Sequence, residues 1–337
     1  MVELWREKVY DTIELGWESQ PVRLSGERAG GRNTEESMMK FQIISDSSCD
    51  LGRDGAEKLG VGLVSFYAAL GDEVYYREER DVSTHDFYQR MADNPGVSPK
   101  TSMPSLEDYM EAMRPAAQQG APLLCVCLNS AFSGSYQSAR NAREELLEEY
   151  PEAQIYVLDS QLATVLQGEL VREAVQLRDE GYTLEQAVQA LEEVRSTGRI
   201  FFTTNDLDYL RNGGRIGRAA ASAGALLKVK PLIGYENQGL VSDGIVQGRK
   251  KSLQRVRELF LRYVEERELD LSQWRVVTGF GLDRAEYDAF TDQIFTDLVQ
   301  RGQDVPRSPV YQIGVTIGVH TGPTPIGVGL LKRAKRP

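Results

Sequence analysis

Three short apolar runs along this chain each end in a segment rich in small polar side chains. The runs span residues 41–44, 123–128 and 155–158, and the polar segments that follow them span residues 45–48, 129–135 and 159–160. Short continuous apolar runs are typical of buried strands in a parallel sheet. Because ligands of open α/β sheets bind beyond the carboxyl ends of the strands, the pattern predicts a pocket for a small polar or anionic group at that edge.

Between these strands the apolar positions follow a helical period, and polar residues mark where the helices begin. Capping-box spacings at Ser83, Ser105 and Thr183 predict three helix starts. A further helix is predicted over residues 136–150, where Pro151 ends it. Alternating strands and helices predict parallel βαβ units with right-handed crossovers.

The pattern changes after about Ser196. Short β-rich runs at residues 200–203, 229–233, 274–278 and 310–319 are interrupted by long helical patterns over residues 251–269 and 283–301. Strands and helices that are segregated in this way are typical of an α+β domain. We therefore predict an α/β protein with two domains and the ligand between them: a Rossmann-like parallel-sheet domain over residues 39–196 and an α+β domain over residues 197–334.

The two ends of the chain differ from the segments between them. Residues 1–38 are polar and rich in helix-breaking residues, so we interpret them as an N-terminal extension. That extension is either a loosely attached arm or a segment that precedes a natural start near Met39. The basic residues at 332–336 are interpreted as a solvated tail.

Composition narrows the range of functions. The 337 residues carry a formal net charge of −11, which argues against binding to a nucleic-acid backbone. No apolar run approaches the ~20 residues that a membrane-spanning helix needs, and the N-terminus lacks the apolar core of a signal peptide. We therefore predict a cytoplasmic protein without a transmembrane segment.

The cysteines and histidines are too few for a metal site of the usual spacing. The chain has three cysteines and two histidines, His85 and His320. Cys125 and Cys127 lie two residues apart in a predicted strand, so they face the same side and are interpreted as small core residues. Neither a metal nor another cofactor is predicted.

Several polar segments are candidates for holding an anion. Ser133 follows a strand and is placed as the N-cap of a helix, and Gly134 allows close approach to the helix N-terminus. Thr101 and Ser102 form a second hydroxyl-rich helix entrance. Asp46 ends the first strand, where a carboxylate is also a candidate for a catalytic role. The structural alternatives are plain helix caps and, for Asp46, organisation of its own loop.

Two further segments contribute a cation and an imidazole. Arg215 lies among glycines, where its planar guanidinium is able to neutralise an anion, although a turn with surface arginines explains the same pattern. His320 is predicted at the end of a strand beside Thr321 and Gly322, where it is placed to hold a carboxylate or a phosphate. The alternative for His320 is a purely structural histidine.

Taken in order, these segments resemble the DegV family of bacterial proteins from about Met39 to the C-terminus. The motifs that carry the resemblance are Asp46-Ser47-Ser48, Thr101-Ser102, Pro104-Ser105, residues 133–139, Asp159-Ser160, residues 207–217, Lys230-Pro231 and residues 320–323. Each motif is weak alone, whereas the ordered set is specific.

The resemblance implies a function in lipid metabolism. It implies the lipid-carrying subunit of bacterial fatty acid kinase, with the EDD fold of that family and one long-chain fatty acid in a tunnel between two domains. A separate ATP-dependent kinase subunit then phosphorylates the carboxylate to an acyl-phosphate for phospholipid metabolism. The carrier is not catalytic alone.

The resemblance also implies roles for residues of this chain. Thr101, Ser102 and Ser133 would hold the carboxylate, and His320 would join them. Arg215, Asp46 and Gly134 would support the headgroup or the region of phosphate transfer.

This chain departs from the family pattern at three places. Met103 stands where the family usually has Gln, Ser135 where it usually has Thr, and Thr324-Pro325 where it usually has Gly after the Gly-Pro pair. The larger residue after Pro323 is expected to reshape the loop beside His320.

Two alternatives remain open from the residues themselves. Cys49 follows the first strand, so one alternative is a hydrolase or transferase with Cys49 as nucleophile and His320 as base. The other alternative is a carrier of a different small anionic ligand that uses the same helix N-terminus.

Overall fold

The computed structural model describes residues 39–71, 74–205, 207–217, 219, 229–236 and 239–336. The predicted extension of residues 1–38 lies outside these residues. The predicted domain boundary between residues 196 and 197 stays a prediction, because the residues from Met39 onward group as one unit by their contacts.

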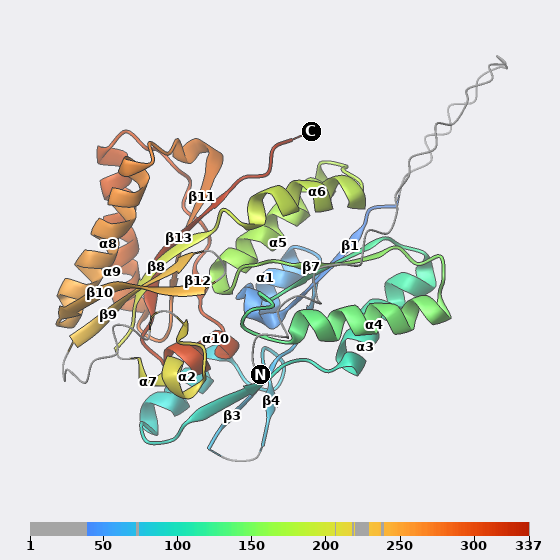
Figure 1. Ribbon diagram of the computed structural model, residues 1–337, viewed down its shortest axis with the longest axis horizontal. Helices are drawn as coiled ribbons and strands as arrows, with labels where there is room; N and C mark the ends of the chain where they lie inside the picture. The colour runs from blue at the N-terminus through green and yellow to red at the C-terminus, as the bar shows by residue number, and fades with distance from the viewer. Residues whose placement is uncertain are drawn as a thin grey trace, which may run out of the picture. The chain divides into compact units, whose positions relative to one another are not determined.

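A four-stranded parallel sheet forms the first part of the structure (Figure 1). Its strands run in the order β2-β1-β6-β7 and span Gln42–Asp46 (β1), Val61–Val64 (β2), Leu123–Cys127 (β6) and Ile155–Asp159 (β7). The three apolar runs are therefore parallel neighbours, as predicted, and their carboxyl ends share one edge. Burial on both faces explains why β6 is continuously apolar.

A six-stranded sheet forms the second part. Its order is β10-β9-β8-β13-β11-β12, with Arg199–Thr203 (β8), Val229–Glu236 (β9), Gly239–Gln247 (β10), Trp274–Phe280 (β11), Tyr311–Gln312 (β12) and Ile326–Lys332 (β13). All of its neighbours pair antiparallel except β11 and β12. This second sheet confirms the predicted change of architecture after the parallel sheet.

A small antiparallel sheet and a set of helices complete the described residues. The small sheet has the order β4-β3-β5, with Tyr67–Leu70 (β3), Tyr76–Arg77 (β4) and Pro99–Ser102 (β5). The helices are Ser47–Cys49 (η1), Gly52–Lys58 (α1), Thr84–Asp93 (α2), Leu106–Gln119 (α3), Ser135–Glu149 (α4), Thr164–Asp179 (α5), Leu184–Arg195 (α6), Asp208–Asn212 (α7), Arg249–Glu266 (α8), Leu271–Gln273 (η3), Arg284–Gln300 (α9) and Val315–Thr321 (α10).

The predicted helix starts are confirmed. Ser105 and Thr183 each make both hydrogen bonds of a capping box, at the starts of α3 and α6. Ser83 accepts a hydrogen bond from the backbone N–H of Asp86 at the start of α2. Helix α4 ends at Glu149, next to the predicted stop.

The helices form layers on the two larger sheets. Helices α3 and α4 pack on one face of the parallel sheet, and α8 and α9 pack together on one face of the six-stranded sheet (Figure 1). Helix α5 has side chains in a core that includes Leu124 of β6 as well as Val277 of β11 and Leu331 of β13. Because it contacts both sheets, α5 fixes how the two lie against each other.

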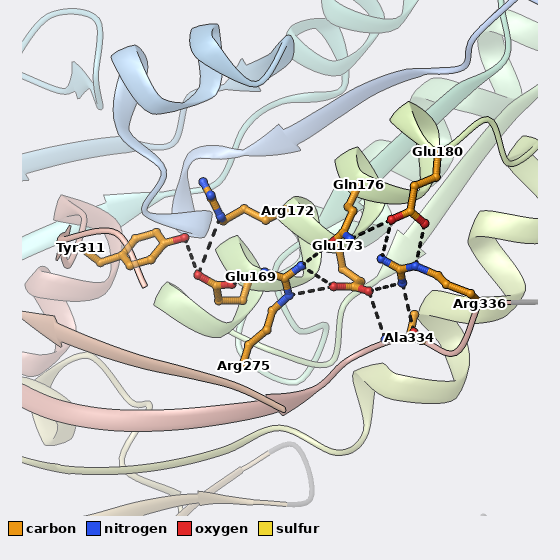
Figure 2. Close-up of polar contacts among 9 residues, drawn as sticks. All are labelled: Glu169, Arg172, Glu173, Gln176, Glu180, Arg275, Tyr311, Ala334 and Arg336. Carbon is orange, nitrogen blue, oxygen red and sulfur yellow. Dashed lines mark hydrogen bonds and ion pairs between the residues drawn. The ribbon is translucent and has the colours of Figure 1, made fainter. Parts of the chain in front are cut away.

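Two carboxylates of α5 are buried in this contact (Figure 2). Arg275 of β11 lies 2.6 Å from Glu173 and 3.4 Å from Glu169, and the Tyr311 hydroxyl donates to Glu169 at 2.8 Å. Burial alone would raise the pKa of Glu173, but Arg275 and Arg336 outweigh it and hold that pKa below its ordinary value. These contacts join α5 to the six-stranded sheet.

The basic C-terminal segment is not the solvated tail that the sequence suggested. Arg336 binds Glu173 at 2.5 Å and Glu180 at 2.7 Å, and the backbone N–H of Ala334 donates to Glu173 at 3.2 Å (Figure 2). The prediction was wrong because a run of basic residues carries no local sign of the buried acids on α5 that it pairs with.

The run 310–319 was predicted as a strand, and this was also wrong. Only Tyr311–Gln312 is a strand, and Val315–Thr321 is helix α10, with His320 in its last turn. The β-branched residues of this run favour a strand locally. Two buried carboxylates from distant segments instead accept N–H groups at the start of the helix, from Gly314 and Thr316.

Within the part of the chain that the structure describes, no helix combines the length and the apolar character needed to cross a membrane.

The ion pairs on α5 give a first prediction. We expect Arg275→Met to lower the free energy of unfolding by about 3 kcal/mol, because it leaves Glu169 and Glu173 buried with fewer charge partners. Urea denaturation measures this change. The matched control is Arg255→Met on α8, which removes an exposed ion pair with Glu258 and should cost less than about 1 kcal/mol. Equal losses in the two variants would contradict the assigned role.

Candidate functional site

A cavity lies between the carboxyl edge of the parallel sheet and the six-stranded sheet. Its volume, counted as the space open to the centre of a water molecule, is about 190 Å³. One ordered water needs only about 10–15 Å³, so the cavity is far larger than a packing defect. Most of its wall is apolar, including Phe66, Leu128, Phe132, Ile200, Phe202, Leu210, Leu240, Ile313, Ile317 and Val328. Such a wall is suited to a largely hydrocarbon ligand.

The structure brings five of the predicted site residues to this cavity. They are Thr101, Ser133, Gly134, Arg215 and His320. They come from β5, the turn before α4, the loop after α7 and the end of α10. Residues that are more than two hundred positions apart in the sequence therefore line one space.

Thr101 and His320 form a hydrogen-bonded pair at the cavity wall. The Oγ1 atom of Thr101 lies 3.1 Å from Nε2 of His320. The Nδ1 atom of His320 is buried without a hydrogen-bond partner among the described residues. An N–H left unpaired is costly, so we place the ring proton on Nε2, where it donates to Thr101. The Thr101 hydroxyl is then able to donate to a ligand.

The environment of His320 keeps its imidazole neutral. Burial lowers its pKa from 6.5 to about 4, and the positive charge of Arg215 acts in the same direction. Gly213 lies against the ring, and a Cβ atom there would be 2.1 Å from Nδ1. A glycine at position 213 is therefore required for His320 to occupy this place.

Ser133 was predicted as an N-cap, but the N-cap of α4 is Gly134. Ser133 still accepts a hydrogen bond from the backbone N–H of Ser135, at 3.2 Å. Its own hydroxyl hydrogen therefore remains available for donation into the cavity. The Sδ atom of Met103 lies close to Gly134, where a Cβ atom would approach it to 2.8 Å.

Asp46 does not line the cavity but lies fully buried behind it. Its carboxylate accepts from the backbone N–H of Leu128 at 2.8 Å, the Ser135 hydroxyl at 2.9 Å and the Gln167 amide at 2.8 Å. Burial raises the pKa of Asp46, while these hydrogen bonds oppose the shift. Through Ser135 it fixes the start of α4, the helix that follows Ser133.

Arg215 is exposed at the cavity wall. Its Nε donates to the carbonyl oxygen of Phe132 at 3.2 Å, and its Nη1 donates to that of Gly213 at 2.6 Å. Among the described residues, no acidic side chain forms an ion pair with it. Its positive charge is therefore available to an anionic ligand.

Ser102 lies outside the cavity lining. Its side chain is exposed, and its hydroxyl contacts the carbonyl oxygen of Met103 at 3.5 Å. The role predicted for Ser102 as a carboxylate ligand stays a prediction. Met103 itself lines the cavity and is 45% exposed, so a thioether stands at the boundary between the cavity and solvent.

The loop after His320 is tied to the loop after β8 and to the start of α8. The hydroxyl of Thr324 accepts from the backbone N–H of Asn205 at 3.1 Å, and its carbonyl oxygen accepts from Arg249 at 2.9 Å. Gly322 has a φ of 79°, and a Cβ atom there would be 2.7 Å from the ring of Tyr209. The departure at Thr324 therefore gives this loop a side-chain anchor that a glycine lacks.

Two acidic residues that sequence reasoning missed hold α10 in place. Asp50 accepts from the backbone N–H of Gly314 at 2.9 Å, and Glu78 accepts from that of Thr316 at 3.0 Å. Burial raises the pKa of both, that of Glu78 to about 7. No local pattern distinguishes these acids from surface acids, so only the fold identifies them.

The cysteine alternative loses its physical basis. Cys49 is fully buried, and burial raises the pKa of its thiol well above the ordinary value, so the thiolate that a nucleophile requires is disfavoured. Cys125 and Cys127 are buried core residues, as predicted. Within the described ranges, no group of three or more His, Cys, Asp or Glu residues is placed to hold a metal ion.

Sequence comparison gives a family match over most of the chain. The model of the DegV family, whose members it describes as uncharacterised proteins, matches residues 40–333. A DegV domain-containing protein of Clostridium perfringens is 30% identical over 303 residues, which cover 89% of this chain and 100% of that protein.

Solved structures with a similar fold include proteins described by what they bind. A stearic acid-binding protein from Eubacterium ventriosum has a TM-score of 0.82 at 38% identity, over 87% of this chain and 98% of its own. A DegV family protein from Thermus thermophilus, described by its fatty acid binding, has a TM-score of 0.75 at 27% identity, over 87% of this chain and 100% of its own.

The raised pKa of Glu78 gives a prediction for the anchor of α10. In the folded protein Glu78 keeps its proton up to a pKa of about 7, whereas the unfolded chain releases it near 4.5. The stability that this proton contributes is therefore lost as the pH rises from about 5 to about 8. Relative to Glu78→Gln, the wild type should lose on the order of 3 kcal/mol over that range. Urea denaturation at several pH values tests this, and a constant difference would contradict it.

The lowered pKa of His320 predicts that stability changes with pH in the opposite direction. The unfolded chain binds a proton near pH 6.5, whereas the folded imidazole resists protonation down to about 4. The free energy of unfolding should therefore fall as the pH drops from about 6.5 to about 4. The fall should be on the order of 3 kcal/mol larger in the wild type than in His320→Asn. Parallel unfolding curves for both proteins check this, with His85→Asn as the matched control on an exposed histidine.

Proposed function

We propose that this chain, which belongs to the DegV family, binds one long-chain fatty acid in the cavity and presents its carboxylate to a separate kinase subunit. The observation that carries the proposal is that the cavity wall is mostly apolar and has a small polar part. Most of the wall is apolar, and the hydroxyls of Thr101 and Ser133 stand with His320 and Arg215 among its few polar groups. An amphiphile with a long tail and one anionic group matches that division.

The tail supplies most of the affinity in this proposal. Burying a saturated chain of about sixteen carbons gains roughly 11 kcal/mol before costs, at about 0.8 kcal/mol per methylene. Loss of translational freedom and ordering of the chain remove a large part of that gain. A small anion without a tail would leave the apolar wall unoccupied, so the cavity does not favour the alternative of another small anionic ligand.

The carboxylate fixes the direction in which the lipid lies. A buried anion is prohibitively costly unless hydrogen-bond donors surround it. The Thr101 hydroxyl accepts from His320 and donates its own hydrogen to the carboxylate. The Ser133 hydroxyl also donates to the carboxylate, and Arg215 adds a positive charge beside them. Each hydrogen bond to a charged group contributes roughly 1.5–3 kcal/mol.

The carrier then needs no nucleophile or strong base of its own. In the proposed division of labour, an ATP-dependent kinase subunit transfers the phosphate to the carboxylate, and this chain holds the acyl group and its orientation. Arg215 is exposed and lines the cavity. In this proposal its positive charge serves both the carboxylate and the incoming phosphate. A cytoplasmic location, where ATP is available, is part of the same proposal.

Lipid analysis of the purified protein tests the proposal. We expect a long-chain fatty acid to co-purify with the chain, and the delipidated protein to bind one added fatty acid per chain. Mass spectrometry under native conditions measures both. Absence of lipid together with no binding to the delipidated protein would contradict the function.

The same assay tests the headgroup site. Ser133→Ala should weaken fatty-acid binding about tenfold, because one hydrogen bond to the carboxylate is lost. Ser130→Ala is the matched control, since Ser130 belongs to the same turn but donates to Asp159, at 2.6 Å, and does not line the cavity. Its affinity should stay within about twofold of the wild type.

A further inference from the structure

The turn that carries Ser133 is organised in large part by one residue, Asn129, which acts through both its backbone carbonyl and its side chain. The carbonyl oxygen of Asn129 accepts from the backbone N–H groups of Phe132 at 2.9 Å and Ser133 at 3.3 Å. Its side-chain oxygen accepts from the backbone N–H of Ala131, also at 2.9 Å. The position of the Ser133 hydroxyl therefore depends on where Asn129 is held.

Asn129 is held from the other sheet. Its Nδ2 donates to the hydroxyl of Tyr235, at 2.9 Å, and Tyr235 lies on β9 of the six-stranded sheet. The Tyr235 hydroxyl in turn donates to the carbonyl oxygen of Gln161, in the loop after β7. Tyr235 is only 2% exposed, and burial raises the pKa of its hydroxyl, which keeps the proton that it donates.

The segment that accepts this hydrogen bond is under backbone constraint. Gln161 has a φ of 54°, in the left-handed region that non-glycine residues rarely adopt. Its neighbour Leu162 accepts from the backbone N–H of Asn129 at 3.0 Å. The hydroxyl of Tyr235 thus joins the loops that follow β6 and β7, the two strands whose carboxyl ends border the cavity.

The ring of Tyr235 has a separate part in the site. It lines the cavity and packs against the ring of Phe132, with 6.0 Å between ring centroids and an interplanar angle of 59°. The carbonyl oxygen of Phe132 accepts from Arg215. The ring therefore faces the space for the ligand, while the hydroxyl faces the turn behind it.

We propose that Tyr235 is a positioning residue that sets headgroup selectivity by holding the Ser133 turn through Asn129. This inference rests on the proposed binding of a fatty acid. In it the ring contributes to tail binding, and the hydroxyl contributes to recognition of the carboxylate through the hydrogen bond to Asn129. Tyr235→Phe separates the two contributions, because it keeps the ring and removes only the hydroxyl.

The test compares two probes that share one tail. Hexadecanoic acid and hexadecan-1-ol differ only in the headgroup, so the ratio of their dissociation constants on the delipidated full-length protein reports recognition of the carboxylate. We expect Tyr235→Phe to lower this preference for the acid about tenfold, while the affinity for the alcohol stays within about twofold. Isothermal titration calorimetry or displacement of a fluorescent lipid measures both constants.

Tyr311→Phe is the matched control. Tyr311 is also a buried tyrosine of the six-stranded sheet, and its hydroxyl donates to Glu169 of α5 (Figure 2). Unlike Tyr235, it does not line the cavity. It should lose comparable stability but keep the wild-type preference for the acid. A purely structural role of Tyr235 predicts that both variants behave alike.

A double-mutant cycle shows whether Tyr235 acts through Ser133. In a Ser133→Ala background, Tyr235→Phe should change the preference for the acid by less than about twofold, because the group that it positions is already absent. Independent, multiplicative effects of the two substitutions would overturn the proposal. So would an unchanged preference in Tyr235→Phe, or an equal loss of affinity for acid and alcohol.

Failure of the proposed function gives a different result. A wild-type protein that binds neither probe contradicts lipid binding itself. A wild type that prefers the acid, with a Tyr235→Phe variant that keeps that preference, leaves lipid binding standing and overturns only the positioning role.

Discussion

The guanidinium of Arg275 is the contact on which the arrangement of the two sheets depends. Helix α5 carries Glu169 and Glu173 into the interior, and these buried charges are tolerated only where a cation reaches them. Arg275 belongs to β11 and Arg336 follows β13, so the two cations that pair with Glu173 both come from the part of the chain that forms the six-stranded sheet. Buried ion pairs add little net stability, but they exclude alternative arrangements in which a charge stays unpaired. The shape of the cavity between the sheets therefore depends on these ion pairs.

Buried acids also fix the segments that carry the polar residues of the cavity. Asp46 fixes the start of α4 beside the Ser133 turn, and Asp50 and Glu78 fix the start of α10, which carries His320 at its other end. The polar groups that line the ligand space include the hydroxyls of Thr101 and Ser133 and the cationic Arg215, whereas the three acids do not line it. An incoming carboxylate therefore meets hydroxyls and a guanidinium rather than like charge.

The sequence was informative where structure is decided locally, as in the buried strands and the capping boxes of α3 and α6. Long-range partners decided the rest. Helix α10 forms in a β-branched run because distant carboxylates accept its first N–H groups, and the basic C-terminus docks because α5 offers buried acids. The ordered motifs located Thr101, Ser133 and His320, whereas Glu78 and Tyr235 carry no local signal and become visible only from their contacts.

The position of the lipid within the cavity is the central claim, and a crystal structure with a fatty acid brominated at its terminal carbon tests it most directly. The account predicts carboxylate density within hydrogen-bonding distance of Thr101 and Ser133, and an anomalous bromine peak against the apolar wall near Ile200 and Val328. A bromine peak beside His320, or a lipid bound outside the cavity, would contradict it.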